Sequence, residues 1–297
     1  MTKRCGFVAI VGAPNAGKST LVNALVGQKV AITSPKAQTT RTRLMGIAIA
    51  DQTQIVLIDT PGIFAPRRRL DRAMVAAAWG GAEGADVIGL IVDAKAGLKS
   101  SIEEMVENLR DRPEPKILIL NKVDIAKKDE LLRLAAGLNA LLAPQDTFFI
   151  SATTGDGVDE LKTALVEAMP EGPWHFPEDQ LSDATERVLA AEVTREQLYL
   201  QLREELPYAS AVDTESYKER KDGSLEIRQQ ILVARPTQKA IVLGKGGSRI
   251  KEIGSAAREE LGAMLGKKVH LFLHVKVKEN WDEDRGLYRD IGLDWVE

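Results

Sequence analysis

Hydrophobic residues in the first part of the chain form short, nearly unbroken runs separated by segments with helical patterns. The runs are GFVAIV at 6–11, IVLIDT at 55–60, VIGLIVD at 87–93, KILILNK at 116–122 and TFFIS at 147–151. Strands made almost wholly of such residues are buried on both faces, which is typical of a parallel sheet covered by helices. Residues 1–170 are therefore predicted to form a doubly wound α/β domain that binds its ligands at the carboxyl ends of the strands.

This alternation stops at a stretch rich in proline and acidic residues. Residues 171–183, GPWHFPEDQLSD with the glutamate before it, are predicted to be an interdomain linker. Beyond it, the pattern predicts a helix, a hairpin around KERKDG at 218–223, two helices around a glycine-rich turn, and a strand at 269–277. Residues 184–297 are therefore expected to form a small α+β domain.

Charge is distributed unevenly along the chain. The formal net charge is −3, which by itself suggests no nucleic-acid partner. Residues 228–278, however, contain eleven Lys and Arg against three Glu, so this segment carries +8 and the remainder −11. Such asymmetry indicates an electrostatic binding surface in the second domain. The one cysteine, Cys5, excludes an intramolecular disulfide, and no apolar run approaches the ~20 residues that span a bilayer.

The first strand leads into a sequence that predicts a phosphate-binding loop. GAPNAGKS at 12–19 fits the pattern G-x-x-x-x-G-K-[ST] and lies between a strand and a helix, so a loop that merely turns the chain is the weaker reading. Inward-facing N–H groups and the helix N-terminus would hold the phosphates, with Lys18 on the β- and γ-phosphates and Ser19 on Mg²⁺. The predicted nucleotide-binding residues here are Gly12, Asn15, Ala16, Gly17, Lys18, Ser19 and Thr20.

Two later strand ends supply residues that recognise a base. LILNKVD ends in Asn121, Lys122 and Asp124, and a carboxylate at 124 can accept hydrogen bonds from N1–H and the 2-amino group of guanine. Adenine lacks both donors, and unpaired buried polar groups are costly, so the sequence predicts guanine specificity. Ser151 and Ala152, one strand further, are expected to brace the base through the Ala152 N–H.

Residues around the γ-phosphate are predicted from the loops near 40 and 60. Asp59 in LIDTPG is suited to hold Mg²⁺ through water, and the Gly62 N–H can meet the γ-phosphate. In SPKAQTTRTRL at 34–44, Thr40 is the predicted third Mg²⁺ ligand, with Thr39 next and a Thr-rich solvated loop as the alternative. Ser19, Thr40 and Asp59 are thus the predicted metal ligands.

Together these motifs resemble the translation-factor-like class of P-loop GTPases. The loop at 12–19, QTTR at 38–41 and DTPG at 59–62 are similar to the Era branch of that class. The resemblance implies GTP hydrolysis with Lys18, Thr40 and Gly62 as catalytic residues. Ile63 stands where many GTPases have a water-orienting glutamine, so slow intrinsic turnover is expected. Relatives with an asparagine at the position of Asn15 use it to hold K⁺, which gives K⁺ dependence as a hypothesis.

The centre of the basic segment resembles a KH domain. AIVLGKGGSRIKEIG at 240–254 has a GXXG sequence between two helical patterns, and a side-chain-poor loop lets a single-stranded backbone approach closely. The element order resembles the type II KH arrangement. A tight interhelical turn in a metabolic domain is the alternative. The predicted RNA-binding residues are Lys239, Gly244, Lys245, Gly246, Gly247, Arg249, Ile250 and Lys251.

A GTPase domain followed by a KH domain resembles the Era family over essentially the whole chain. The resemblance implies a bacterial, monomeric, cytoplasmic GTPase that binds the 3′ end of 16S rRNA and assists assembly of the 30S subunit. It also implies loose association with the inner membrane, for which the sequence shows no anchor. The alternatives are a GTP-dependent signalling or RNA-modification factor with a protein or another RNA as target, and a metabolic NTPase with a small substrate.

Overall fold

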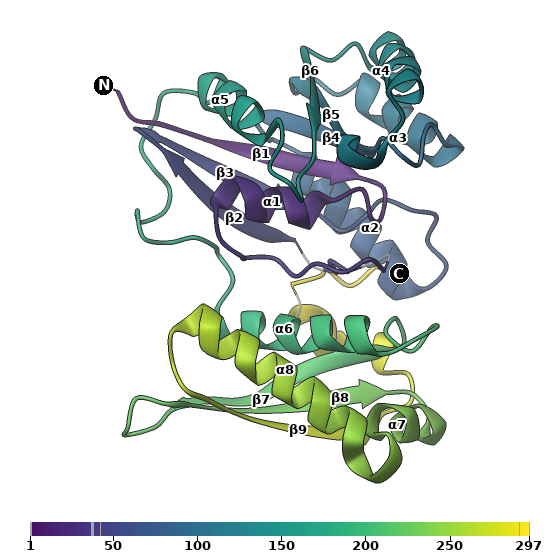
Figure 1. Ribbon diagram of the computed structural model, residues 1–297, viewed down its shortest axis with the longest axis vertical. Coiled ribbons are helices and arrows are strands. Elements are labelled where there is room, and N and C mark those ends of the chain that lie inside the picture. The colour runs from purple at the N-terminus through teal and green to yellow at the C-terminus, as the bar shows by residue number, and fades with distance from the viewer. Residues whose placement is uncertain (1, 37–38, 42, 291, 297) are drawn as a thin grey trace. The chain divides into compact units, whose positions relative to one another are not determined.

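The computed structural model describes residues 2–36, 39–41, 43–290 and 292–296. The chain forms two compact units. Within the described ranges, the first comprises residues 1–33, 40–183 and 296, and the second comprises residues 34–39 and 184–295. Figure 1 labels the helices and strands of both units.

The first unit is built on a six-stranded sheet in the order β2-β3-β1-β4-β5-β6. Five strands are parallel, as the buried runs predict, and β1 lies between β3 and β4 in its centre. The strands are β1 Arg4–Gly12, β2 Leu44–Ala50, β3 Thr53–Asp59, β4 Val87–Asp93, β5 Lys116–Asn121 and β6 Asp146–Ile150. The predicted doubly wound α/β architecture is confirmed, and the carboxyl ends of the parallel strands share one edge.

The edge strand β2 was not predicted from the sequence, and it makes the sheet mixed rather than purely parallel. β2 pairs antiparallel with β3 from Leu44 opposite Asp59 to Ala50 opposite Thr53. Asp51, with a φ of 51°, and Gln52 make the tight connection between them. A two-residue connection suits only antiparallel neighbours, because a parallel pair needs a long crossover.

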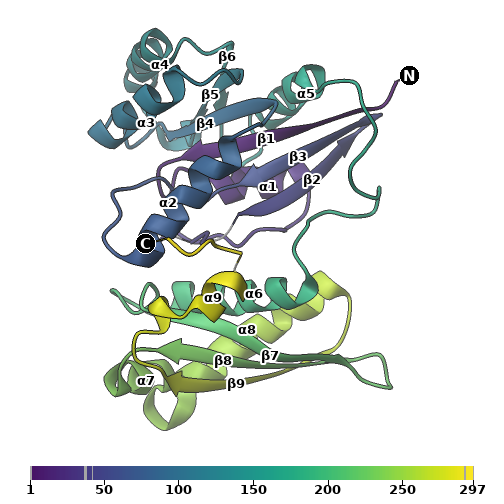
Figure 2. The same cartoon turned by 180° about the vertical axis from the view of Figure 1, so that it is seen from behind.

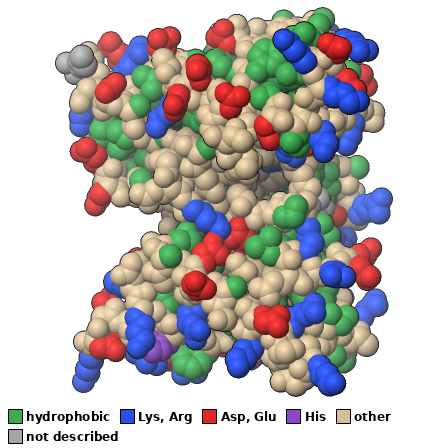
Figure 3. Space-filling view, in the orientation of Figure 1, with side chains coloured by type: hydrophobic (Ala, Val, Ile, Leu, Met, Phe, Trp, Pro, Cys, Tyr) green, Lys and Arg blue, Asp and Glu red, His purple; other side chains and the backbone are tan. Residues whose placement is uncertain are grey.

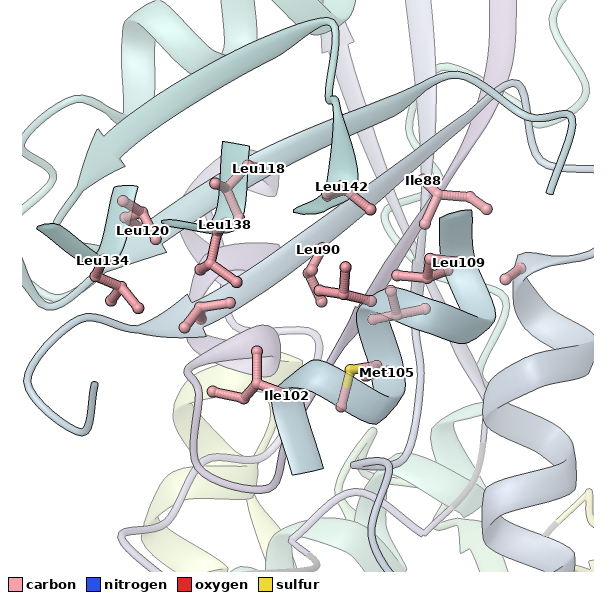
Figure 4. Packing of buried hydrophobic residues seen from close by; sticks show 14 of the residues in the cluster. Ile88, Leu90, Ile102, Met105, Leu109, Leu118, Leu120, Leu134, Leu138 and Leu142 are labelled. Atoms are coloured by element: carbon pink, nitrogen blue, oxygen red, sulfur yellow. The ribbon is translucent and has the colours of Figure 1, made fainter. Parts of the chain in front are cut away.

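Helices cover both faces of this sheet. α1 and α5 pack on one face, and α2, α3 and α4 pack on the other (Figure 1). A core of aliphatic side chains joins β4 and β5 to α3 and α4; Figure 4 shows Leu90, Leu118, Leu109 and Leu138 among them. The helices are α1 Lys18–Val26, α2 Arg69–Ala82, α3 Ser100–Arg110, α4 Lys128–Leu142 and α5 Val158–Ala168. This rigid layer structure holds the loops at the carboxyl edge of the sheet.

The segment expected to be a linker, 171–183, packs on the first unit. The buried Gln54 of β3 accepts hydrogen bonds from the backbone N–H groups of His175 and Phe176 at 2.9 and 3.0 Å, and its amide donates to the Phe176 carbonyl. Further along, the Ile47 N–H of β2 donates to Leu181 O at 2.8 Å. The segment is therefore fixed along the edge of the sheet up to residue 183.

The second unit contains a three-stranded sheet in the order β7-β8-β9. β7 and β8 form the predicted antiparallel hairpin, and β9 pairs parallel with β8 from Val269 opposite Leu225 to Val277 opposite Val233. α6 and α8 pack on one side of the sheet, and Figure 2 views it from the other side. The elements are α6 Glu186–Gln201, β7 Ser210–Glu219, β8 Leu225–Val233, α7 Pro236–Leu243, α8 Ser248–Leu265, β9 Val269–Val277 and α9 Arg285–Asp290.

Candidate functional site

The loop between β1 and α1 adopts a backbone that only glycine can follow at its tightest points. Gly17 has a φ of 103°, and a Cβ there would lie 2.1 Å from the Asn121 side-chain nitrogen. A Cβ on Gly12 would lie 2.4 Å from the Ile91 carbonyl oxygen. Of the other predicted residues, Ala16 directly precedes Gly17, and Ser19 and Thr20 lie in the first turn of α1. The glycines let this loop close against the ends of β4 and β5.

Lys18 is buried at the base of this loop. Its Nζ donates hydrogen bonds to the carbonyls of Gly12 at 3.1 Å and Ala13 at 2.9 Å. Burial lowers the pKa of the ammonium to about 8, although the nearby Asp59 carboxylate raises it in part. A charged group that is poorly compensated in this way favours an anionic ligand. The geometry therefore fits the predicted role of Lys18 as a phosphate-binding residue.

Three oxygen-bearing side chains predicted to hold a metal lie together beside Lys18. Ser19 Oγ is 2.7 Å from Asp59 Oδ2 and 2.8 Å from Thr40 Oγ1, and Thr40 Oγ1 is 3.3 Å from the same carboxylate oxygen. Asp59 is fully buried. Hydroxyl and carboxylate oxygens are hard donors that suit Mg²⁺, which is bound through a few protein ligands plus phosphates and water. The donor set therefore fits the metal that the sequence predicts.

The structure distinguishes the two threonines considered for the metal. The Thr39 hydroxyl donates to the Lys36 carbonyl at 2.8 Å and lies 3.1 Å from Ser34 Oγ, so it is engaged in its own loop. Thr40 instead reaches the Ser19 and Asp59 oxygens. Gln38 of the QTTR sequence lies outside the described residues.

Gly62 lies against the phosphate loop. A Cβ there would approach the Pro14 backbone nitrogen at 2.8 Å and its Cα at 2.9 Å. The next residue, Ile63, donates its N–H to the Gly12 carbonyl at 3.1 Å. The DTPG segment thus lies against the phosphate loop, which fits the predicted role of Gly62, while the Ile63 side chain has no group that orients water.

Asn121 connects three loops at the carboxyl edge. Its side-chain Nδ2 donates to the Ala16 carbonyl at 2.8 Å, and its Oδ1 accepts from the Ala152 N–H at 2.9 Å. Both bonds are buried. The Ala152 N–H, expected to contact the base, therefore donates to Asn121 in this structure. Ser151 stabilises the same loop, because its Oγ accepts from the Thr154 N–H at 3.2 Å.

Lys122 makes a second connection, between the loop that follows β5 at 121–125 (the base loop, after its predicted role) and the phosphate loop at 12–19. Its Nζ donates to the Asn15 carbonyl at 2.8 Å and to Asp93 Oδ2 at 2.6 Å. Asp124 follows in a short 3₁₀ turn, Val123–Ile125, with an exposed side chain that a base can reach. Sequence reasoning did not select Asp93, because no motif includes the residue at the end of β4.

The glycine-rich turn of the second unit also requires its glycines. Gly244, Gly246 and Gly247 have φ values of 71°, 61° and 79°. A Cβ on Gly244 would lie 2.8 Å from the Arg249 Cβ, whereas no atom lies within 4 Å of a Cβ on Gly246 or Gly247. The turn between α7 and α8 is therefore open on its outer side, as contact with a nucleic-acid backbone requires.

Basic and apolar residues surround this turn. Lys245 and Lys251 are exposed and Lys239 is half-buried, while the Arg249 guanidinium donates to the Gln201 carbonyl at 3.4 Å. Figure 3 shows several Lys and Arg side chains on the second unit toward its α7 end. Ile250 packs partly against the core. Ile241 is 53% exposed next to the buried Val242, and its place on the outer side of α7 was not evident from the sequence.

None of the helices in the described part of the chain combines the length and apolar character that a membrane span needs.

Comparison with known proteins gives one family match in each of the two units. The 50S ribosome-binding GTPase family matches residues 7–122, and the KH domain family matches residues 205–282. GTPase Era of Erythrobacter litoralis is 64% identical over 297 residues, covering 99% of this chain and 98% of that protein. GTPase Era of Sinorhizobium medicae is 56% identical, covering 98% of this chain and 94% of that protein.

Two solved structures of Era proteins match the chain across both units. Aquifex aeolicus Era, in a variant bound to GDP·AlF4⁻, is 40% identical with a TM-score of 0.92, covering 97% of this chain and 99% of that chain. Era in complex with MgGDPNP and nucleotides 1506–1542 of 16S ribosomal RNA is also 40% identical with a TM-score of 0.92, covering 98% and 99%. The resemblance inferred from the sequence, including the KH fold, is confirmed. The chain belongs to the Era family of GTPases, and its activity is GTP hydrolysis.

Proposed function

We propose that this GTPase is a switch that binds the 3′-terminal region of 16S rRNA through its KH domain and assists assembly of the 30S subunit. The observation that carries the RNA part is the open GXXG turn, Gly244–Gly247, in a segment with a local charge of +8. A relative with a TM-score of 0.92 is solved with nucleotides 1506–1542 of 16S rRNA, which supports the same partner here. GTP is proposed to favour RNA binding and hydrolysis to release it.

The nucleotide is proposed to bind at the carboxyl edge of the first sheet. Lys18 would exchange its carbonyl partners for β- and γ-phosphate oxygens, and Asp124 would accept from N1–H and the 2-amino group of guanine. Ser19 would hold Mg²⁺ directly and Asp59 through water; the ion neutralises phosphate charge as it develops. Thr40 would join them when the γ-phosphate is present, which its position beside Ser19 supports. Gly62 would offer its N–H to the γ-phosphate.

We further propose that K⁺ assists hydrolysis. Ile63 cannot orient or deprotonate water, so the missing transition-state stabilisation must come from another group. Asn15, which has a left-handed φ of 64°, lies in the phosphate loop and is the proposed side-chain ligand. Turnover by the purified protein should be faster in KCl than in NaCl, and this difference should disappear in Asn15→Ala. Equal turnover in both salts would remove K⁺ from the proposal.

We expect the protein to act as a monomer in the cytoplasm, with any contact with the inner membrane made by its surface. Size-exclusion chromatography and fractionation of cells at low and high salt test these expectations. Dimers at micromolar concentration, or membrane retention at high salt, would contradict them.

The decisive experiment measures RNA binding as a function of nucleotide. A labelled 16S rRNA 3′ fragment should bind the protein more tightly with a non-hydrolysable GTP analogue and Mg²⁺ than with GDP. Crosslinks should map to the GXXG turn. A fragment of the same length with a scrambled sequence is the control, and equal binding of both fragments would contradict a specific rRNA target.

A further inference from the structure

A carboxylate outside all of the nucleotide-binding sequences lies beside the base loop. Asp93 is the last residue of β4, and in the parallel pairing it lies opposite Asn121, the last residue of β5. Its Oδ2 accepts a hydrogen bond from Lys122 Nζ at 2.6 Å. The same ammonium group donates to the Asn15 carbonyl at 2.8 Å. One lysine therefore connects the end of β4, the base loop and the phosphate loop.

Backbone hydrogen bonds fix the orientation of the Asp93 carboxylate independently of Lys122. Its second oxygen, Oδ1, accepts from the backbone N–H groups of Lys95 at 3.0 Å and Ala96 at 3.1 Å. The carboxylate therefore loses little freedom when it pairs with Lys122. The two side chains are only 22% and 30% exposed, so solvent screens their attraction less than it screens a surface ion pair.

Lys122 adopts a conformation that a lysine rarely has. Its φ is 67°, in the left-handed region that is uncommon for residues with a side chain. Such a conformation persists where surrounding contacts determine it, and these positions cluster at functional sites. Here it turns the chain at the end of β5, and the lysine side chain reaches the Asp93 carboxylate and the Asn15 carbonyl.

We propose that Asp93 is a positioning residue for guanine-nucleotide binding, because its negative charge holds Lys122 where it ties the base loop to the phosphate loop. This rests on the proposed assignment of Asn121, Lys122 and Asp124 as the base site. Without the charge, the ammonium can move toward solvent and its hydrogen bond to the Asn15 carbonyl is weakened. The two loops are then held less firmly at the separation that base and phosphates require, and bound nucleotide leaves faster.

The test measures release of a fluorescent GDP analogue from the full-length protein in the presence of Mg²⁺. Asp93→Asn keeps an oxygen for the Lys95 and Ala96 N–H groups and removes only the charge. Because a charge-assisted hydrogen bond exceeds a neutral one by about a factor of ten in equilibrium terms, release should be about tenfold faster. Asp93→Glu should be closer to the original protein. The matched control is Asp146→Asn, an exposed aspartate at the start of β6, which should have no effect.

A double-mutant cycle separates positioning from a general loss of structure. Lys122→Met should speed release, and Asp93→Asn in that background should add nothing, because its effect passes through Lys122. Unchanged release in Asp93→Asn, or independent effects that multiply, would overturn the inference. Unchanged release in Lys122→Met would instead remove the proposed base site, and the inference with it. If Asp93→Asn does not fold, Asp93→Ser, whose hydroxyl also caps the turn, replaces it.

Discussion

The side chain of Asn121 provides the sharpest test of how the nucleotide site is held. It is 2% exposed and makes two buried hydrogen bonds, one to the Ala16 carbonyl at 2.8 Å and one from the Ala152 N–H at 2.9 Å. Asn121→Ala removes both partners at once. A buried donor or acceptor left unpaired costs ~1–3 kcal/mol, so keeping both loops in place without the amide costs ~2–6 kcal/mol.

Most of this cost should appear in nucleotide affinity rather than in folding. In the nucleotide-free protein, both loops can open and let the Ala16 carbonyl and the Ala152 N–H bond to water. Nucleotide binding requires the loops to close again, so the penalty returns with the ligand. A loss of ~2–6 kcal/mol corresponds to a decrease in GDP affinity of about 30-fold or more, since ~1.4 kcal/mol is a factor of ten.

The assay is a titration of fluorescent GDP with Mg²⁺, alongside thermal unfolding without nucleotide. Asn139→Ala is the matched control, because Asn139 donates to the Ala135 carbonyl at 2.8 Å and accepts from the Thr147 hydroxyl at 2.9 Å. It joins α4 to β6, away from the loops, so this change should lower stability and leave GDP affinity unchanged. Equal loss of affinity in both variants, or less than a threefold loss in Asn121→Ala, would refute the reasoning.

Three further predictions follow from the two sites. Burial lowers the Lys18 pKa to about 8, and bound phosphate should raise it, so GDP binding should take up protons just above pH 8 and should weaken as pH rises. Calorimetry in two buffers of different ionisation enthalpy measures this proton uptake. An identical heat of binding in both buffers would contradict it. Gly246→Asp should abolish RNA binding and keep GTP affinity. The control is Gly266→Asp, which should change neither property, because Gly266 has the same φ of 61° and equally open surroundings. RNA binding retained in Gly246→Asp would contradict RNA binding by the GXXG turn. Asp124→Asn should shift preference toward xanthosine nucleotides, whose 2-oxo group accepts from the new amide, and a competition assay that still favours GDP would exclude Asp124 as the base reader.

The same Lys18 pKa has a consequence for stability without nucleotide. Above about pH 8 the folded protein begins to lose this proton while the unfolded chain, with an ordinary lysine, keeps it until near pH 10.5. The unfolded state therefore binds more protons in this window, and the contribution of Lys18 to stability rises with pH. Ligand affinity and ligand-free stability thus respond to pH in opposite directions at this one group.

Elements with a strong hydrophobic pattern were predictable, and elements held by pairing were not. The run at 87–93 is buried on both faces and could only be an inner strand, and β4 has these bounds. β2 at Leu44–Ala50 has two alanines and a glycine among its seven residues and follows a polar loop, so its own pattern is weak. It is a strand because β3 and the Leu181 carbonyl supply its backbone partners.

The packing of segment 171–183 was even less predictable from the sequence. Its prolines and acidic residues predict an interdomain linker, and the segment contains no helix or strand, but composition does not say whether such a segment is free. The partner that fixes it, Gln54, lies more than 120 residues earlier in the chain. Gln54, the second residue of β3, is fully buried in the structure, and a buried amide needs hydrogen-bond partners from somewhere.

Motifs made it possible to predict a candidate site because phosphate, magnesium and guanine each restrict the residue types that can serve them. The choice between Thr39 and Thr40 needed coordinates, because two adjacent threonines are chemically identical and differ only in direction. Asp93 and the Arg249 contact with the Gln201 carbonyl were not predictable for a related reason. Each contact joins residues from separate helices, strands or loops, and the spacing of residues along the sequence does not show which of them will be close in space.

The polar residues of the proposed nucleotide site bond to one another, and these bonds bear on how a nucleotide would bind. Lys18 holds two carbonyls, Asn121 bridges two loops, and Lys122 bridges two more groups. Asn121 and Lys122 can keep these bonds when nucleotide binds, so they lower the ordering cost of association. The proposed role of Lys18 requires it to exchange its carbonyl partners for phosphate, and burial, which lowers the pKa of its ammonium to about 8, favours an anionic partner. We therefore expect phosphate binding to depend on the exchange at Lys18, and nucleotide release to depend on the bonds of Asn121 and Lys122.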